Sequence, residues 1–214
     1  MSLHFILGRA GSGKTTFCQQ AIRQELLKAP QGPPLIWLVP EQATFIHEMA
    51  LLDRNELPGS SRGEVLSFQR LAHRYGNQER KTWLDSTGKT MLTAQCLEHC
   101  RENLRLFQVT AHHEGFIPMV LAAMEELQRY NLSPEALNRA AAFFLQEAPE
   151  STIARKLSDL SLIYQGYSTG VAEQYTDSER GLKDLAAYLP QQNRLVGAKI
   201  WLDGFASFTP IQLG

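Results

Sequence analysis

The sequence predicts an α/β fold, in which a parallel sheet core of the P-loop type is interrupted by an inserted all-helical subdomain. Three observations support this prediction. A glycine-rich loop at residues 8–15 lies between a short apolar run and a helical pattern. A continuously apolar run at residues 35–39 is typical of a strand covered on both faces, and strand character returns at residues 198–202. Residues 82–189 have helical spacing almost throughout.

The first part of the core alternates between predicted strands and helices. Residues 3–7 are apolar and predict a buried strand that leads into the glycine-rich loop. A helix is expected over residues 15–28, with Phe17, Ala21 and Leu26 facing the core. Further elements are expected as strands at residues 35–39 and 64–67 and as helices at residues 45–52 and 68–75.

The helical insertion begins near Thr82, where strand character disappears. Within it, Ser133 followed by Pro134 predicts a helix start, because serine caps helices and proline fits the first helical position. Strand character returns only at residues 198–202. We therefore predict an incomplete core and a fragment of a longer protein, divided into a first core part at residues 1–80, a helical insertion at residues 81–195 and a return to the core at residues 196–214.

Bulk composition predicts an ordinary globular protein. The chain is 43% hydrophobic and 20% charged, with a formal net charge of -1, so any attraction to DNA must come from a local patch. Three cysteines do not make a disulfide framework and are typical of a reducing cytoplasm. No apolar run approaches the roughly 20 residues of a membrane span, and we expect a cytoplasmic protein that does not contact membranes.

The glycine-rich loop matches the pattern G-x-x-x-x-G-K-[ST], which binds nucleotide phosphates. Its glycines let consecutive backbone N–H groups point at phosphate oxygens, and the following helix adds the positive end of its dipole. Lys14 would bind the β- and γ-phosphates of ATP, and Thr15 would bind Mg²⁺. The alternative is a chance glycine turn. The predicted nucleotide-binding residues are Gly8, Arg9, Ala10, Gly11, Ser12, Gly13, Lys14, Thr15 and Thr16.

A second Mg²⁺ ligand is expected at the end of another buried strand, where P-loop sites place an acidic residue. Asp203 follows the apolar residues Ile200, Trp201 and Leu202 and is the candidate. The alternative is that Asp203 only caps the turn after a strand.

Several motifs resemble those of superfamily-one helicases of the UvrD type. Residues 11–15 resemble their first motif, residues 67–74 resemble motif Ib, and residues 203–212 resemble motif II. The helical insertion falls where those helicases insert their 1B subdomain. The resemblance implies a RecA-like core.

The departures from the helicase pattern concern ATP hydrolysis. Motif II of those enzymes has a glutamate that acts as general base, and this chain has Gly204 at that position. Motif II of those enzymes also has a glutamine that senses the γ-phosphate of ATP, and this chain has Ala206 there. No glutamine precedes the glycine-rich loop to bind adenine. Glu41 replaces an aromatic residue that stacks on DNA in motif Ia. The chain itself is therefore expected to bind ATP without a catalytic residue of its own.

This combination is similar to the AddB family, the B subunits of the bacterial ATP-dependent helicase/deoxyribonucleases AddAB or RexAB. The resemblance implies a role in double-strand break repair by homologous recombination, in a heterodimer with an AddA-like helicase/nuclease subunit that acts on DNA ends. It also implies recognition of the recombination hotspot Chi. The family's nuclease domain and iron–sulfur cluster would lie outside this chain. The matching stretches are residues 8–15, 38–45, 67–72, 159–164 and 203–210.

If the helicase-like surface holds single-stranded DNA, its polar and aromatic side chains are the expected contacts. Gln42 and Thr44 can bond base edges, aromatic rings can stack on bases, and arginines can bind phosphate or guanine. The alternatives are a core role for Phe68 and solvated helix charges for Arg70 and Arg74. The predicted DNA-binding residues are Gln42, Thr44, Phe68, Arg70, His73, Arg74, Phe205 and Phe208.

Two other classes of function fit the loop. A small P-loop phosphotransferase would explain the size, although no arginine-rich lid is evident, and a purely structural module would carry a vestigial loop. Cys96, His99 and Cys100 do not have a common zinc-site spacing, so we assign them no metal.

Overall fold

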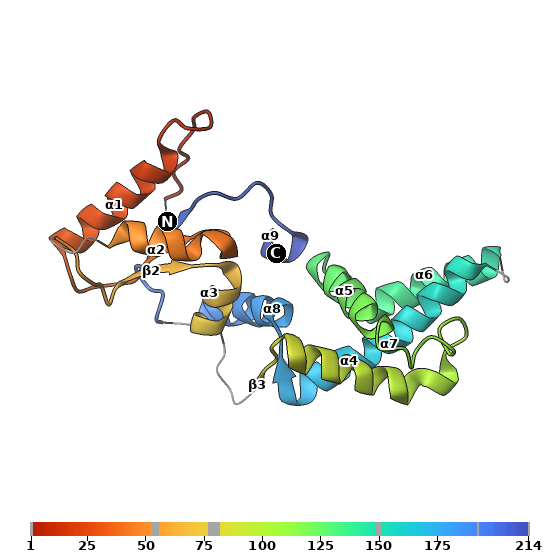
Figure 1. Ribbon diagram of the computed structural model, residues 1–214. Helices are drawn as coiled ribbons and strands as arrows, with labels where there is room; N and C mark the ends of the chain where they lie inside the picture. Colours follow the sequence, from red (N-terminus) through yellow and green to blue (C-terminus); the bar gives the residue numbers. More distant parts are fainter. Residues whose placement is uncertain (1, 53–55, 77–81, 149–150, 192, 214) are drawn as a thin grey trace. The chain divides into compact units, whose positions relative to one another are not determined.

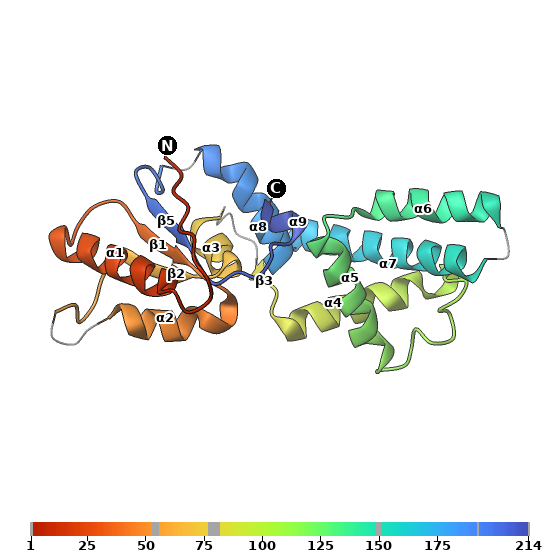
Figure 2. The same cartoon turned by 90° about the horizontal axis from the view of Figure 1, so that it is seen from above.

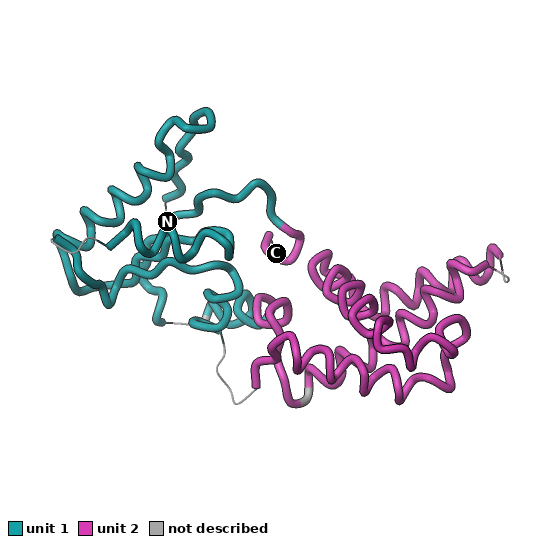
Figure 3. The backbone as a smooth tube through the Cα atoms, viewed as in Figure 1, with its two compact units in different colours: residues 1–77, 184–208 teal, residues 78–183, 209–214 magenta. Residues whose placement is uncertain are grey.

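The computed structural model describes residues 2–52, 56–76, 82–148, 151–191 and 193–213. The chain divides into two compact units, coloured separately in Figure 3. The sheet unit contains residues 1–77 and 184–208, and the helical unit contains residues 78–183 and 209–214. Among the described residues, no helix has both the length and the hydropathy needed to cross a lipid bilayer.

The sheet unit is built on three parallel strands in the order β2-β1-β5 (Figure 2). β1 (Leu35–Leu38) is the central strand, with β2 (Gly63–Leu66) on one side and β5 (Lys199–Leu202) on the other. The residues of β1 are at most 3% exposed, because both faces of the central strand are covered. The parallel sheet predicted from the apolar run at residues 35–39 is therefore confirmed, but the buried strand expected before Asp203 is not, since Ile200 and Leu202 of β5 are 49% and 53% exposed.

Helices α1 (Lys14–Lys28) and α2 (Thr44–Leu51) pack on one face of this sheet. The helices contribute Cys18, Ile22, Leu26 and Leu51 to a core that also contains Leu35, Trp37, Val39, Leu57 and Val65. A 3-10 turn, η1 (Glu41–Ala43), leads from β1 into α2, and α3 (Phe68–Tyr75) follows β2 directly. The predicted helix at residues 68–75 has the predicted bounds.

The predicted strand at residues 3–7 is wrong. These residues form no strand, and Leu3, Phe5 and Leu7 are 78%, 79% and 90% exposed. A strand requires a neighbour to pair its backbone N–H and C=O groups, and none of the described strands pairs with this segment. Apolar composition therefore identifies strand propensity but cannot supply the pairing partner.

The predicted buried face of α1 is also partly wrong. Leu26 is buried as expected, but Phe17 is 56% exposed, and Cys18 and Ile22 occupy the core positions instead. Residues 18, 22 and 26 repeat every four positions and thus lie on one side of the helix. Side-chain size alone favours Phe17 for the core. The orientation of α1 on the sheet instead places its neighbour Cys18 there.

The core of the helical unit comes mainly from three helices, labelled in Figure 1. These are α4 (Ser86–Cys100), α5 (Phe116–Arg129) and α7 (Thr152–Gln174), with Val120, Met124 and Tyr167 among the most buried residues. Met119, whose spacing also predicts a core position, is 69% exposed. The remaining elements are η2 (Arg101–Asn103), α6 (Pro134–Glu147), α8 (Ser178–Tyr188), which the unit boundary divides, η3 (Leu189–Gln191) and α9 (Pro210–Leu213).

The insertion is not entirely helical, since β3 (Thr82–Trp83) pairs in parallel with β4 (Tyr175–Thr176). Two-residue strands have no periodic signal, so the sequence does not predict them. The predicted start of α6 is confirmed, with the Ser133 hydroxyl accepting from the Ala136 N–H and Pro134 in the first turn. The predicted boundary after residue 80 lies outside the described residues, and the three-part division stays a prediction.

Candidate nucleotide and nucleic-acid site

The glycine-rich loop has backbone conformations that only glycine adopts easily. Gly11 and Gly13 have φ values of 76° and 86°, in the left-handed region. At Gly8, an added Cβ would lie 2.3 Å from the Ser12 hydroxyl oxygen, so the Ser12 side chain would have to move to make room for it. The loop closes with a hydrogen bond from the Ser12 N–H to the Arg9 carbonyl, and α1 begins immediately afterwards at Lys14.

Lys14 folds back over this loop. Its ammonium group donates to the carbonyl oxygens of Gly8 and Arg9, each at 2.9 Å. The lysine is therefore aligned with the loop by local bonds, and an anionic phosphate at the same position would offer it stronger, charge-assisted acceptors. Thr15 and Thr16 are exposed on the first turn of α1, where the helix dipole favours an anion.

Asp203 lies directly after β5, with its backbone N–H bonded to the carbonyl of Leu38. Its carboxylate is largely buried, and Oδ2 has no hydrogen-bond partner among the described residues. The same oxygen lies 4.0 Å from Nε2 of His47 on α2. Burial raises the pKa of the Cys18 thiol, and the Asp203 charge raises it further, so this carboxylate acts close to the first turns of α1.

The residue after Asp203 has a positive φ. Gly204 has a φ of 78°, and a Cβ there would meet nothing closer than Pro40 Cδ at 3.5 Å. Space is therefore available, but the backbone conformation is one that residues with a side chain rarely adopt. A glutamate base of the helicase type cannot be placed here without a cost in backbone energy.

Three predicted stacking residues come together in one aromatic cluster within the sheet unit. The ring centroid of Phe68 lies 5.4 Å from that of Phe205 and 6.2 Å from that of Phe208. Phe205 and Phe208 are 5.0 Å apart, and Phe208 is 38% exposed. These distances are those of ordinary aromatic packing, so the rings support one another and still present an edge to solvent.

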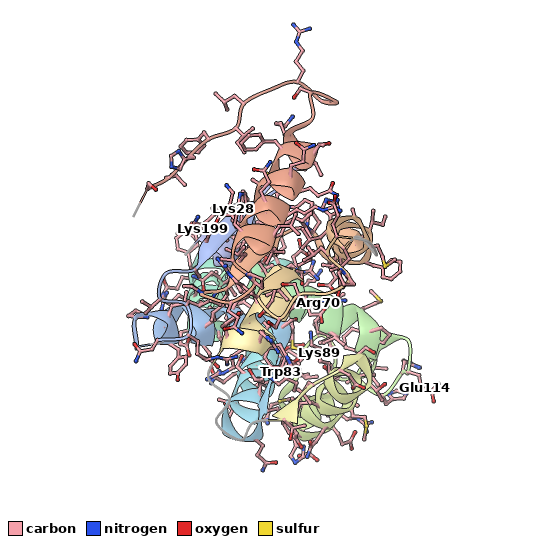
Figure 4. The ribbon with its side chains drawn as sticks, turned by 90° about the vertical axis from the view of Figure 1, so that its left-hand side faces the viewer. Lys28, Arg70, Trp83, Lys89, Glu114 and Lys199 are labelled. Carbon is pink, nitrogen blue, oxygen red and sulfur yellow. The ribbon has the colours of Figure 1, made fainter. Side chains whose placement is uncertain are left out.

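Beside this cluster, Glu41 joins the turn after β1 to the start of α3. Its carboxylate accepts from the hydroxyl of Ser67 and from Nε of Arg70, the latter at 3.1 Å. Arg70 is labelled in Figure 4. Ser67 is buried and also caps α3 by accepting from the Arg70 N–H. Glu41, where the helicase resemblance leads one to expect an aromatic residue, is therefore paired with Arg70.

The other predicted DNA-binding residues differ in how they are presented. Gln42 and His73 are exposed. Thr44 is 2% exposed and its hydroxyl donates to the Glu41 carbonyl, so it stabilises the turn before α2 and does not face solvent. Arg74 makes a two-point ion pair with Glu64 of β2, at 3.2 and 3.3 Å. Thr44 and Arg74 therefore have structural partners that the sequence does not reveal.

Sequence reasoning misses three residues around this region. The sequence shows Glu41 only as a departure from the helicase pattern, and it singles out neither His47 nor Arg194. Arg194 donates to the Arg74 carbonyl and lies over the Tyr75 ring, 5.1 Å from its centroid. The positive charge of Arg194 could have suggested it as a DNA contact. Its position beside α3, however, depends on contacts with Arg74 and Tyr75, which are far away in the sequence.

The chain is similar to known proteins over nearly its whole length. The family described as ADDB, N-terminal, matches residues 5–214. The chain belongs to this family. The B subunit of the ATP-dependent helicase/deoxyribonuclease of Desulforudis audaxviator is 43% identical over 98% of the chain, and the proteins of the same name from Heliobacterium modesticaldum and Symbiobacterium thermophilum are each 41% identical over at least 99% of it. The family predicted from the motifs is confirmed.

The chain spans 18% of the length of each of these AddB-family relatives. In the part of the chain that the structure describes, no three His, Cys, Asp or Glu side chains are grouped to hold a metal ion. Cys96 and Cys100 are free, and burial raises the pKa of both thiols, that of Cys96 to about 11. Raised values of this kind are typical of inert structural thiols.

Proposed function

We propose that this chain is a helicase-like domain of an ATP-dependent DNA helicase/nuclease subunit, which binds nucleotide and single-stranded DNA and does not hydrolyse ATP itself. The observation that carries the proposal is the conformation of the loop, with Gly11 and Gly13 at positive φ and Lys14 at the start of α1. The names of the AddB-family relatives supply the ATP, the DNA and the subunit organisation.

The residues present fit a nucleotide with Mg²⁺. The loop offers backbone N–H groups at the N-terminus of α1, and Lys14 would move its ammonium group from two carbonyls to the phosphates. Thr15 would hold the cation, and the unpartnered Asp203 Oδ2 would accept from one of its bound waters. When bound, Mg²⁺ would neutralise phosphate charge.

Hydrolysis would need a base to take a proton from the attacking water. Glycine at position 204 cannot provide one, and Ala206 cannot sense the γ-phosphate through a side-chain amide. Nucleotide binding here would then be a structural or regulatory event, while a partner subunit provides the motor. We propose an AddA-like helicase/nuclease subunit as that partner, in a cytoplasmic heterodimer that repairs double-strand breaks.

The DNA surface would be the edge formed by η1, α3 and the loop after β5. The aromatic cluster of Phe68, Phe205 and Phe208 offers ring edges and faces for bases, and Gln42 and His73 are exposed nearby along the same elements. A core that holds a strand without stepping along it could read a sequence such as Chi. Base stacking contributes about 1–3 kcal/mol per ring in such sites.

The experiment uses the full-length subunit assembled with its partner subunit and measures two affinities on each variant, one for labelled ATP with Mg²⁺ and one for single-stranded DNA. Lys14→Ala should lower the subunit's ATP affinity at least tenfold and leave DNA affinity unchanged. Phe68→Ala should lower DNA affinity about tenfold and leave ATP affinity unchanged. Each variant thus serves as the folding control for the other.

Lys28→Ala is the matched lysine control, because Lys28 is exposed in the last turn of the same helix (Figure 4). ATP binding that is equal in the native protein and in Lys14→Ala would contradict a working nucleotide site and favour a vestigial loop. Transfer of phosphate from ATP to a small acceptor would favour a phosphotransferase instead.

A further inference from the structure

Among the residues that the structure describes, three polar side-chain atoms in one region of the sheet unit are buried without a hydrogen-bond partner. They are Nε1 of Trp37 on β1, Nδ1 of His47 on α2 and Oδ2 of Asp203 after β5. Trp37 is fully buried, and the side chains of His47 and Asp203 are 19% and 10% exposed. Buried polar atoms are almost always hydrogen-bonded, so this region is completed by further polar groups such as bound water.

His47 lies between the other two residues. The centroid of its ring is 4.7 Å from a ring centroid of Trp37, and its Nε2 is 4.0 Å from Asp203 Oδ2. The second distance is too long for a direct hydrogen bond. It does fit one water molecule bonded to both atoms, because two hydrogen bonds of about 2.8 Å that meet at a water span about 4 Å.

Tertiary contacts of α2 hold His47 in this place. Leu51 of α2 belongs to the core of the sheet unit, and the side-chain amide of Gln19 on α1 donates to the carbonyl of Ala50. The backbone of α2 is thus fixed beside α1 one turn after His47. The imidazole therefore has a defined position next to Asp203, unlike a side chain on a mobile surface segment.

We propose that His47 is a positioning residue for the cation of the nucleotide site, and that one water shared with its imidazole fixes the Asp203 carboxylate in the orientation that receives Mg²⁺. The Nε2–H group donates to this water, and the water donates to Oδ2. The remaining lone pairs of the carboxylate then accept from water bound to the cation. The inference rests on the proposed binding of ATP with Mg²⁺, and His47 lies outside the phosphate-loop pattern.

This role separates His47 from the phosphate loop. Lys14 is aligned by the carbonyls of Gly8 and Arg9, so it needs neither His47 nor the cation to reach a phosphate. Loss of His47 should therefore weaken the effect of Mg²⁺ on ATP binding and spare ATP binding without Mg²⁺. Removing a group that orients a metal ligand costs about 10–100-fold in metal affinity.

The test uses the full-length subunit assembled with a partner subunit whose own ATP site is inactivated. Labelled ATP is titrated first in EDTA and then at increasing Mg²⁺ concentrations, which should strengthen its binding to the native protein. His47→Leu should raise the Mg²⁺ concentration of half-maximal effect about tenfold and leave the ATP affinity in EDTA unchanged. His47→Gln keeps an N–H donor close to the Nε2 position and should retain most of the native Mg²⁺ response.

Two comparisons separate positioning from a general loss of structure. Asp203→Asn should weaken the Mg²⁺ response, and adding His47→Leu to it should cause no further loss, because His47 acts through Asp203. His99→Leu removes an exposed imidazole from α4 in the helical unit and should keep the native Mg²⁺ response.

The outcomes distinguish failure of this inference from failure of the proposed function. If the native protein binds no ATP with or without Mg²⁺, the proposed nucleotide binding fails and the inference fails with it. If it binds ATP in EDTA and Mg²⁺ adds nothing, nucleotide binding stands and the cation site is rejected. If His47→Leu keeps the native Mg²⁺ response, or loses ATP affinity equally in EDTA and in Mg²⁺, the nucleotide site stands and the positioning role of His47 is rejected.

Discussion

At the scale of single residues, the strongest constraints are positive φ angles at glycines and fixed ion pairs at charged groups. Gly11, Gly13 and Gly204 all have φ between 76° and 86°. The first two are explained by the phosphate-loop pattern. Gly204 also has a backbone conformation that a residue with a side chain would adopt only with strain.

Gly204→Glu should destabilise the protein by about 1–2 kcal/mol without creating ATP hydrolysis, because a side chain is strained at a φ of 78°. Denaturant unfolding of the chain and an assay of phosphate release would measure the two effects. Ala206→Glu is the matched control, since it adds the same side chain two residues later without a positive φ. Equal stability of the two variants would show that the strain is absent.

Residue types alone could predict the loop glycines, Lys14 and the Ser133 cap, because these act on atoms a few positions away. They could not predict that Thr44 is buried or that Arg74 is bound by Glu64. In both cases the decisive partner belongs to another element or turn. The nucleotide and DNA contacts stay predictions.

At the scale of elements, a buried carboxylate ties helix α7 to the loop after η2. Asp159 is 1% exposed and accepts hydrogen bonds from three consecutive backbone N–H groups, those of Arg105, Leu106 and Phe107, at 2.7–3.1 Å. Three amides that converge on one carboxylate satisfy both its charge and their own bonding needs. This segment therefore has a fixed course although it has no regular secondary structure.

Asp159→Ala should leave these three amides without their acceptor and lower the stability of the helical unit by about 3 kcal/mol. Hydrogen exchange is the direct measurement, and the amides of Arg105, Leu106 and Phe107 should lose most of their protection. Asp184→Ala, elsewhere on α8 in the sheet unit, is a carboxylate control that should not change their exchange. Unchanged protection in Asp159→Ala would contradict this role.

The three sheet strands, the helices α1, α2 and α3 and the start of α6 could be predicted within one or two residues, because each has its own pattern or local cap. Residues 3–7 show the limit of such patterns. Their composition is that of a buried strand, but a strand exists only when a neighbour pairs with it.

At the scale of the whole molecule, each compact unit contains a tyrosine whose hydroxyl donates to a carboxylate, Tyr75 to Glu64 and Tyr167 to Asp177. Burial raises the pKa of Tyr75 in the sheet unit to about 12, assisted by its hydrogen bond to Glu64. Burial raises the pKa of Tyr164 in the helical unit to about 12, and the pKa of Tyr167 is shifted in the same direction by burial and Asp177. Both units therefore hold these protons more tightly when folded.

The free energy of unfolding should consequently fall at alkaline pH. An unfolded tyrosine loses its proton near pH 10, whereas folded Tyr75 and Tyr164 keep theirs until about pH 12. The stabilisation is complete below about pH 10 and is lost as the pH rises towards 12, by roughly 2 kcal/mol for each tyrosine. Denaturant midpoints across this range measure the loss. Tyr75→Phe should reduce it in the sheet unit, and a flat profile would contradict the prediction.

The sequence by itself determined the family, the glycine-rich loop, the three sheet strands and the absence of a glutamate after Asp203. These features depend on residue type and on spacing within one element. Only the tertiary structure decided that Glu41 holds Arg70, that three phenylalanines form one cluster, and that residues 3–7 stay outside the sheet. Each of these depends on a partner far away in the chain, and the position of that partner is fixed only when the elements pack.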